Sequence, residues 1–338
     1  MIPHIKHLCQ GKIYLYLNFF SEWGTLKHEV PQGSFWGPPL FIIYINDLPL
    51  RINCVSELVI FVGDSSIIIS RRNFKDFCSL SNLVLSHMIK WFAANNLVLN
   101  LDKMNVMKFI TKNSSHSTLH FDYKEKYVEE TVNTKFLGLK IDNHINWKNH
   151  IEEMIPKLSG AYYAIRSIVH INTMNTLISI YCVYFHSVII YGINFWVNSF
   201  ISWKLFMLQK IIVRIMAGTQ PRTLCWSLFK QLKILPVPRK YVLSLMSFSI
   251  SNQEILQTNS FIHNINTRNK HHHSRPNANL YCFQKSTFYA GLKIFNGLPP
   301  SVTTLKNDKA KFKAALRKCL HTHFSYSVDE FFMCEGDL

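Results

Sequence analysis

Asp64 is a carboxylate, a side chain of the type that can ligate metal ions. It follows Gly63 in a short polar stretch that separates two apolar runs, 58–62 and 67–69. Carboxylate oxygens are the ligands that hard cations such as Mg²⁺ prefer, but one carboxylate alone cannot hold the two ions of a two-metal centre. The glycine between two apolar runs also fits an ordinary hairpin turn, which is the interpretation that we favour for the present chain.

Three consecutive histidines, His271-His272-His273, are a second candidate for metal ligation. Zinc sites combine histidine and cysteine at short, regular spacings, and Cys282 alone does not complete such a pattern. Because lysine and arginine residues surround the run, we favour a solvated basic loop over 264–280. Such a loop could contact phosphates, which attract cations regardless of base sequence.

Several tryptophans could stack nucleic-acid bases. The candidates are Trp147, Trp203 and Trp226. Aromatic residues at helical spacing more often belong to a hydrophobic core, and we favour that interpretation for all three.

The charge and the hydrophobic content limit the classes of protein to which this chain can belong. The 338 residues include 37 Lys and Arg against 20 Asp and Glu, a formal net charge of +17, and 48% of them are hydrophobic. The hydrophobic content predicts a sizeable core and argues against wholesale disorder. The positive charge favours polyanionic partners, with nucleic acid first and an acidic membrane surface second. A basic surface kept for solubility is the alternative.

Cysteine usage and the N-terminal residues bear on location. The eight cysteines are scattered without any Cys-x-x-Cys pair, which predicts free thiols in a reducing compartment. Lys6, His7 and Lys12 interrupt any apolar run near the N-terminus, so no secretory pattern is present. We expect an intracellular protein of the nucleus or cytoplasm that is not secreted.

Residue periodicity predicts a mixture of strands and helices. Strands are expected at 57–62 and 66–70, paired around Gly63, and further strands at 97–101, 106–110 and 135–141. Two apolar stripes at helical spacing predict two long helices, and their residues are Phe77, Leu80, Val84, Met88 and Trp91, then Trp147, Ile151, Met154, Leu158, Tyr162, Ile165 and Val169. Pro156 lies within the second stripe and should kink or break that helix. More helices are expected over 174–217 and at 307–321.

The segment 176–203 contains no Asp, Glu, Lys or Arg. A membrane-spanning helix needs about 20 apolar residues, so the length suffices. His186, Asn194 and Asn198 dilute the apolar character, and we therefore expect the segment to pack inside the fold. A membrane protein that uses this segment is retained as an alternative.

An ordered series of motifs resembles the reverse transcriptases of non-LTR retrotransposons of the Jockey, CR1 and RTE-like type. It begins with Pro-Gln-Gly-Ser at 31–34, Gly-Pro at 37–38 and an apolar run that ends in Asn-Asp-Leu-Pro at 46–49. The later motifs are Phe61-Val62-Gly63-Asp64, Trp91 to Lys103, Phe136-Leu137-Gly138, Trp147-Lys148, His150-Ile151, Tyr191-Gly192 with Trp196, Leu208-Gln209-Lys210, and 295–299. The resemblance covers about residues 21–320.

The resemblance implies roles for particular residues. Gln32 and Gly33 would hold the template and the incoming nucleotide, and Phe136, Leu137 and Gly138 would form the primer grip. Asp64 would ligate Mg²⁺, the cofactor of the family. Lys103 would protonate the leaving pyrophosphate as a general acid.

The carboxylates that the family needs are largely missing. The family supplies one aspartate upstream of the Gln-Gly turn, but no aspartate precedes Asp47, and the only acids before it are Glu22 and Glu29. Gly63 stands at the first position of the family's aspartate pair. We therefore expect Asp64 and Lys103 to be vestigial and Mg²⁺ not to bind productively.

We accordingly predict an α+β chain that is an N-terminally truncated member of this family. Residues 1–142 would form a partial polymerase palm with an antiparallel sheet and the primer grip, 143–235 a helical thumb, and 236–338 a family-specific C-terminal helical region. The function would be that of a catalytically inactive remnant of an RNA-directed DNA polymerase. The first alternative is a non-catalytic basic protein that binds RNA or DNA in a salt-dependent way with low specificity, without a membrane partner.

Overall fold

The computed structural model describes residues 35–52, 56–61, 64–98, 100, 103–109, 130–252, 272–322 and 330, and the backbone of six two-residue strands. Those strands are β1 (Gln10–Gly11), β2 (Tyr14–Leu15), β3 (Phe19–Phe20), β4 (Gly24–Thr25), β7 (Asp122–Tyr123) and β8 (Lys126–Tyr127). The chain is a mixed α+β protein, as predicted. It divides into two compact units, Met1–Val106 with His116–Glu130, and Met107–Ser115 with Thr131–Leu338.

The described helices of the first unit and its longest hairpin form one group, beside the two-residue strands β1–β4, β7 and β8. This group consists of α1 (Gly37–Ile45), α2 (Leu48–Ile52), β5 (Glu57–Phe61), β6 (Asp64–Ile68) and α3 (Phe74–Ala94). Pro38 and Pro39 occupy the first turn of α1, where a missing N–H costs no intrahelical hydrogen bond.

Strands β5 and β6 pair antiparallel, which confirms the predicted hairpin. Phe61 is opposite Asp64, and Glu57 is opposite Ile68. The two residues that connect the strands are Val62 and Gly63, which lie outside the described residues.

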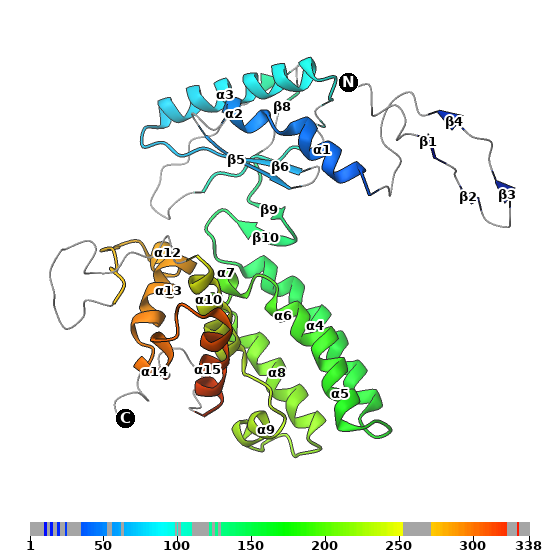
Figure 1. Cartoon of the computed structure of the whole chain (residues 1–338), viewed down its shortest axis with the longest axis vertical. Coiled ribbons are helices and arrows are strands. Elements are labelled where there is room, and N and C mark those ends of the chain that lie inside the picture. The colour runs from blue at the N-terminus through cyan, green and yellow to red at the C-terminus, as the bar shows by residue number, and fades with distance from the viewer. Residues whose placement is uncertain are drawn as a thin grey trace. The chain divides into compact units, whose positions relative to one another are not determined.

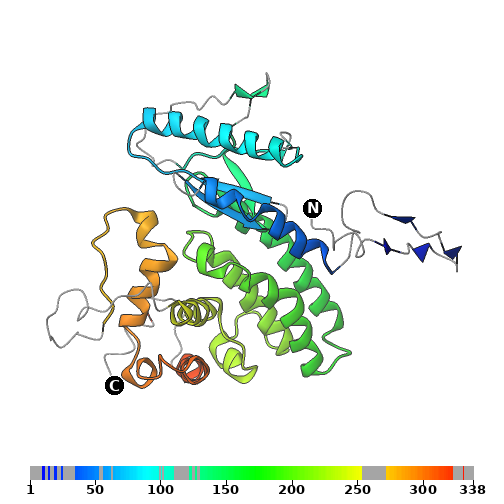
Figure 2. The same cartoon turned by 45° about the horizontal axis from the view of Figure 1, so that its top comes forward.

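Helix α3 lies over this hairpin and completes a small core (Figure 2). Its predicted stripe faces inward, with Val84, Met88 and Trp91 buried. The buried members of this core are Ile45, Leu48, Ile52, Val84, Met88 and Trp91. The helix begins at Asn73, whose side chain accepts a hydrogen bond from the backbone N–H of Lys75, and such a cap stabilises a helix start by about 1 kcal/mol.

Two predicted strands, at 97–101 and 106–110, are not found among the described residues. The N–H of Leu97 donates to the carbonyl of Phe92 at 2.8 Å, and Asn96 has a left-handed φ of 53°. These features close the end of α3, so Leu97, the first residue of the first run, belongs to a helix terminus, while residues 99 and 101 lie outside the described residues. In the second run, Val106 forms an isolated parallel bridge with Glu130.

The second unit is mainly helical. Its elements are β9 (Asn133–Phe136), β10 (Leu139–Asp142), α4 (Lys148–Ile168), α5 (Met174–Ile180), a π-helical segment η3 (Tyr181–His186), α6 (Ser187–Ile190), α7 (Ile193–Trp196), α8 (Trp203–Met216), α9 (Cys225–Gln231), α10 (Val237–Ser251), α12 (Tyr281–Gln284), α13 (Thr287–Asn296), α14 (Pro300–Thr303) and α15 (Lys309–Thr322). The hairpin β9–β10 belongs to this unit, whereas we expected residues up to 142 to group with the preceding palm. The reason is that Leu139 is buried in the helical core.

The helices of this unit share one core. In Figure 1, α4 and α5 run side by side next to α8, and α10 packs against α13 and α15. The predicted stripe of α4 is confirmed: Trp147, Ile151, Met154, Leu158 and Ile165 are buried, and Tyr162 and Val169 are partly buried against the core. Pro156 lies on the exposed side of α4, and the helix continues across it, so the predicted break is not found.

The charge-free segment 176–203 packs within the helical unit, as predicted. It is divided among α5, η3, α6 and α7, and it buries Leu177, Tyr181, Phe185 and Ile189 at intervals of four residues. Over the described parts of the chain, none of the helices combines the length and the apolar character needed to cross a bilayer.

Candidate functional site

Asp64, the residue expected to ligate metal, is the first residue of β6 and is exposed. Its nearest acid along the hairpin, Glu57, lies at the far end of β5, four residue pairs away, or roughly 13 Å at the usual strand rise. Asp47 accepts a hydrogen bond from the Trp91 indole at 3.1 Å. Among the described residues, no three His, Cys, Asp or Glu side chains group to hold a metal ion. The described carboxylates therefore do not fit a two-metal Mg²⁺ centre.

The other expected catalytic and template residues are not assembled by the described structure. Lys103 is exposed in a short turn, where its N–H donates to the carbonyl of Asn100 at 3.3 Å. Gln32 and Gly33 lie outside the described residues, as does Gly63.

The expected primer grip, Phe136-Leu137-Gly138, is the tip of a tight hairpin. We predicted one strand with Gly138 inside it, but β9 ends at Phe136 and β10 begins at Leu139. The two residues between them both have left-handed backbones, with φ 47° at Leu137 and 79° at Gly138. Two such residues make a turn whose twist matches that of the strands it joins. The apolar run concealed the turn because leucine rarely adopts this conformation.

This turn is attached to a second motif, Tyr191-Gly192. The Tyr191 hydroxyl donates a hydrogen bond to the carbonyl of Leu137. A Cβ at Gly138 would lie 3.3 Å from the Tyr191 hydroxyl, and a Cβ at Gly192 would lie 2.6 Å from the Leu139 side chain. An added Cβ would therefore be tight against Tyr191 at Gly138, and at Gly192 it would require the Leu139 side chain to shift.

The junction between β10 and α4 is also held in a strained conformation. Ile145 and Trp147 have left-handed φ values of 54° and 61°, which cost about 1–2 kcal/mol each for residues with a Cβ. The buried carboxylate of Asp142 accepts hydrogen bonds from the N–H groups of His144, Asn146 and Trp147. Strained residues persist only where surrounding contacts over-determine them, and Asp142 supplies those contacts. An aspartate just before a helix was the sequence signal for this role.

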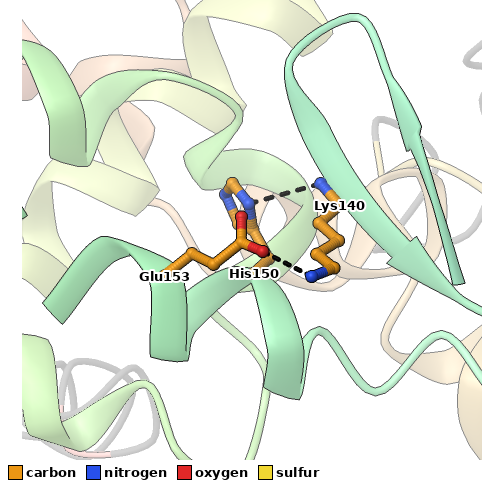
Figure 3. Close-up of polar contacts among 3 residues, drawn as sticks. All are labelled: Lys140, His150 and Glu153. Atoms are coloured by element: carbon orange, nitrogen blue, oxygen red, sulfur yellow. Dashed lines mark hydrogen bonds and ion pairs between the residues drawn. The ribbon is translucent and has the colours of Figure 1, made fainter. Parts of the chain in front are cut away.

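Three polar side chains, Lys140, His150 and Glu153, join the hairpin to α4 (Figure 3). The Lys140 backbone N–H donates to His150 Nδ1 at 3.4 Å, so the ring of neutral His150 carries its proton on Nε2. Burial lowers the pKa of His150. The Lys140 ammonium pairs with Glu153, and this hydrogen bond lowers the pKa of the Glu153 carboxyl. His150 and Glu153 of α4 therefore anchor the hairpin through Lys140.

A buried polar network centred on Gln209 was not anticipated from the sequence. The Gln209 amide donates to the Tyr181 hydroxyl at 2.8 Å and to the Leu235 carbonyl at 3.0 Å, and its oxygen accepts from the Val237 N–H at 2.8 Å. The Lys240 ammonium donates to the same Tyr181 hydroxyl at 3.0 Å. The network ties η3, α8 and α10 together. A glutamine at a core position of an amphipathic helix was the only signal.

We expected the histidine run to lie in a solvated loop, but one of its members is buried. His273 is buried, and its ring centroid lies 4.5 Å from that of Phe295. The Asn296 side chain bonds both the N–H and the carbonyl of His273, at 2.8 and 2.9 Å. His273 is therefore part of the packing around α13. His272 is exposed, and His271 lies outside the described residues.

The three candidate tryptophans differ in how far they are exposed. Trp147 is 8% exposed, as expected for the core, but Trp203 is 54% and Trp226 43% exposed, so the core prediction was wrong for these two.

From Met154 to Asn307 the sequence has 16 Lys and Arg residues and one acid, Glu254. This segment therefore carries many cations and a single carboxylate, although Arg239 and Lys240 among the cations are buried.

No protein-family model, curated protein or solved structure matches this chain. Its function is therefore inferred from the chemistry and charge of the described residues.

Proposed function

We propose that the chain binds RNA or DNA with low sequence specificity, as a derivative of a non-LTR retrotransposon reverse transcriptase that lacks polymerase activity. The observation that carries this proposal is the charge of the segment from Met154 to Asn307, which has 16 Lys and Arg and one acid. Such a surface favours phosphate backbones, because released counterions drive association independently of sequence.

The relationship to reverse transcriptases is supported by the ordered motifs and by the packing of two of them. The motif at Leu137-Gly138 and the motif at Tyr191-Gly192 are joined by a hydrogen bond and by close contact at both glycines. Motif residues that serve a packing role can persist in a chain whose chemistry has been lost.

The proposed loss of polymerase activity is supported by the carboxylates. Two-metal phosphoryl transfer needs ligands for both ions. Asp64 and Glu57 lie at opposite ends of their hairpin, and Gly63 replaces the neighbouring carboxylate of the family pattern.

Salt-dependent binding tests the first half of the proposal. Fluorescence anisotropy of labelled RNA and DNA oligonucleotides should give association constants that fall linearly with the logarithm of salt, losing about tenfold or more between about 50 and 200 mM. Association that is absent at the lower salt concentration, or unchanged by salt, would contradict nucleic-acid binding.

Primer extension tests the second half. The purified chain should give no RNA-templated DNA synthesis with Mg²⁺ or Mn²⁺, while an active reverse transcriptase under the same conditions serves as the positive control. Templated extension that disappears on Asp64→Ala would show that the chain is an active polymerase.

A further inference from the structure

The outward face of α8 combines exposed apolar side chains with cations. Trp203, Met207 and Ile211 follow one another at intervals of four residues, and all are exposed. Lys210 and Arg214 follow Trp203 by about two and three helical turns, so they emerge in the same stripe.

The opposite face of α8 is fixed in the core. Leu205, Gln209, Ile212, Val213 and Met216 are buried there. The helix therefore packs into the core on one side and presents its mixed face on the other.

The start of α9 extends this face. The Arg214 guanidinium donates to the carbonyl of Thr223 at 2.9 Å, and the Cys225 thiol lies 3.8 Å from the carbonyl of Lys210. Leu224 and Trp226, which neighbour these contacts in the sequence, are exposed. The outward face of α8 and residues 222–226 together are called here the α8–α9 face.

We propose that the α8–α9 face binds single-stranded nucleic acid, with Trp203 and Trp226 stacking on unpaired bases and the neighbouring cations contacting phosphates. This inference rests on the proposed function, and it specifies the binding site and the form of nucleic acid that is bound. Indole rings stack on any base, but only on bases that are not already stacked inside a duplex. Lys204 is exposed beside Trp203, and Lys210 is partly exposed with its ammonium 4.3 Å from the centre of the Phe206 ring.

Single-stranded nucleic acid fits the face better than an anionic membrane surface does. Helices that lie on membranes separate their cations onto a polar face, opposite the apolar one. Here Lys210 and Arg214 lie in line with Trp203 on the outward side of α8.

The test compares two labelled strands of equal length, an oligothymidylate and an abasic strand that has the same phosphates without bases. Trp203→Ala and Trp226→Ala should each weaken binding of the oligothymidylate by about tenfold and leave binding of the abasic strand unchanged. Trp203→Phe, which keeps an aromatic face, should retain most of the affinity. Tyr163→Ala, which removes an exposed aromatic from α4, is the matched control and should have no effect.

The cations are tested in the same assay. Lys204→Ala with Lys210→Ala should weaken binding of both strands, whereas the exposed pair Lys313→Ala with Lys318→Ala on α15 removes the same charge and should weaken binding less. Circular dichroism melts confirm that each variant is folded.

The outcomes separate this inference from the proposed function. If the native chain binds neither strand at low salt, the proposed function fails. If it binds the oligothymidylate and the tryptophan variants bind it equally well, the α8–α9 face is not the site and this inference alone fails. Loss of binding to phosphatidylserine vesicles in the tryptophan variants, with oligothymidylate binding intact, would assign the face to membranes and overturn the inference.

Discussion

The Tyr191 hydroxyl donates a hydrogen bond to the carbonyl oxygen of Leu137, 54 residues earlier in the chain. The acceptor belongs to a hairpin turn whose two residues both have left-handed backbones. The bond therefore holds a strained turn against the helical core. Tyr191 in turn receives support from Trp196, whose indole donates to the Tyr191 carbonyl at 3.0 Å.

Removing the Tyr191 hydroxyl should destabilise the helical unit. Tyr191→Phe keeps the ring and deletes the donor, so the free energy of unfolding in urea should fall by about 1 kcal/mol. Tyr163→Phe, at an exposed tyrosine of α4, is the control and should change it by less than about 0.5 kcal/mol. Equal effects of the two substitutions would mean that the bond to Leu137 contributes nothing.

A comparison of two glycines separates the cost of a left-handed backbone from the cost of side-chain overlap when glycine is replaced by alanine. Gly192 and Gly218 have nearly the same φ, 65° and 63°, but an added Cβ would lie 2.6 Å from Leu139 at Gly192 and would meet nothing within 4 Å at Gly218. Gly218→Ala should cost about 1–2 kcal/mol from its backbone alone. Gly192→Ala should cost about 1–3 kcal/mol more, from overpacking. Thermal melts that show the same loss for both would contradict the contact between Gly192 and Leu139.

The buried Gln209 network should behave as a unit. Gln209→Leu would leave the Leu235 carbonyl and the Val237 N–H without the partners that they have now, at about 1–3 kcal/mol for each buried group. In a double-mutant cycle with Tyr181→Phe, we expect a coupling energy of about 0.5 kcal/mol or more. Additive effects in urea unfolding would show that the two side chains do not interact.

Lys240 should make stability depend on pH. Burial lowers the pKa of Lys240 to about 7 from its ordinary value of 10.5. Between these two values the unfolded chain binds more protons than the folded chain, so stability should rise with pH across that window and fall as pH drops toward 7. Burial raises the pKa of Tyr181, which acts in the opposite direction above about pH 10, so measurements should stay below about pH 9.

Lys240→Met removes this titration and is the direct test of it. The dependence of the urea midpoint on pH between about 7 and 9 should flatten in the variant. Lys313→Met, at an exposed lysine of α15, should leave the native slope in place. A native chain whose stability does not change across this window would refute the role assigned to Lys240.

Restoring one carboxylate should not restore polymerase activity. Gly63→Asp recreates the aspartate pair with Asp64 but not the aspartate upstream of the Gln-Gly turn, which the sequence lacks. Because both metal ions need ligands, primer extension by Gly63→Asp should stay at the level of the unmodified chain. The same substitution in a chimera with an intact upstream palm strand and fingers should be active if Asp64 is correctly placed. Synthesis by Gly63→Asp alone would show that the upstream aspartate is not required.

Local patterns in the sequence were sufficient to predict much of the fold. The apolar stripes of α3 and α4, the hairpin around Gly63, the terminal helix α15 and the burial of 176–203 all follow from spacing. Such patterns are informative because each depends on one element and the side that it buries. The charge that supports nucleic-acid binding is likewise a property of composition.

The tertiary structure decided which residues of a pattern meet each other. Leu137 lies in a turn rather than a strand because Tyr191 and the packing of Leu139 hold it there, and neither contact has a local signal. Trp147, at the start of α4, is buried in the helical core with its ring 6.2 Å from that of Phe195, while Trp203, at the start of α8, is exposed. Whether an aromatic residue belongs to the core or to a binding face depends on what packs beside it, and residues distant in the sequence supply that packing.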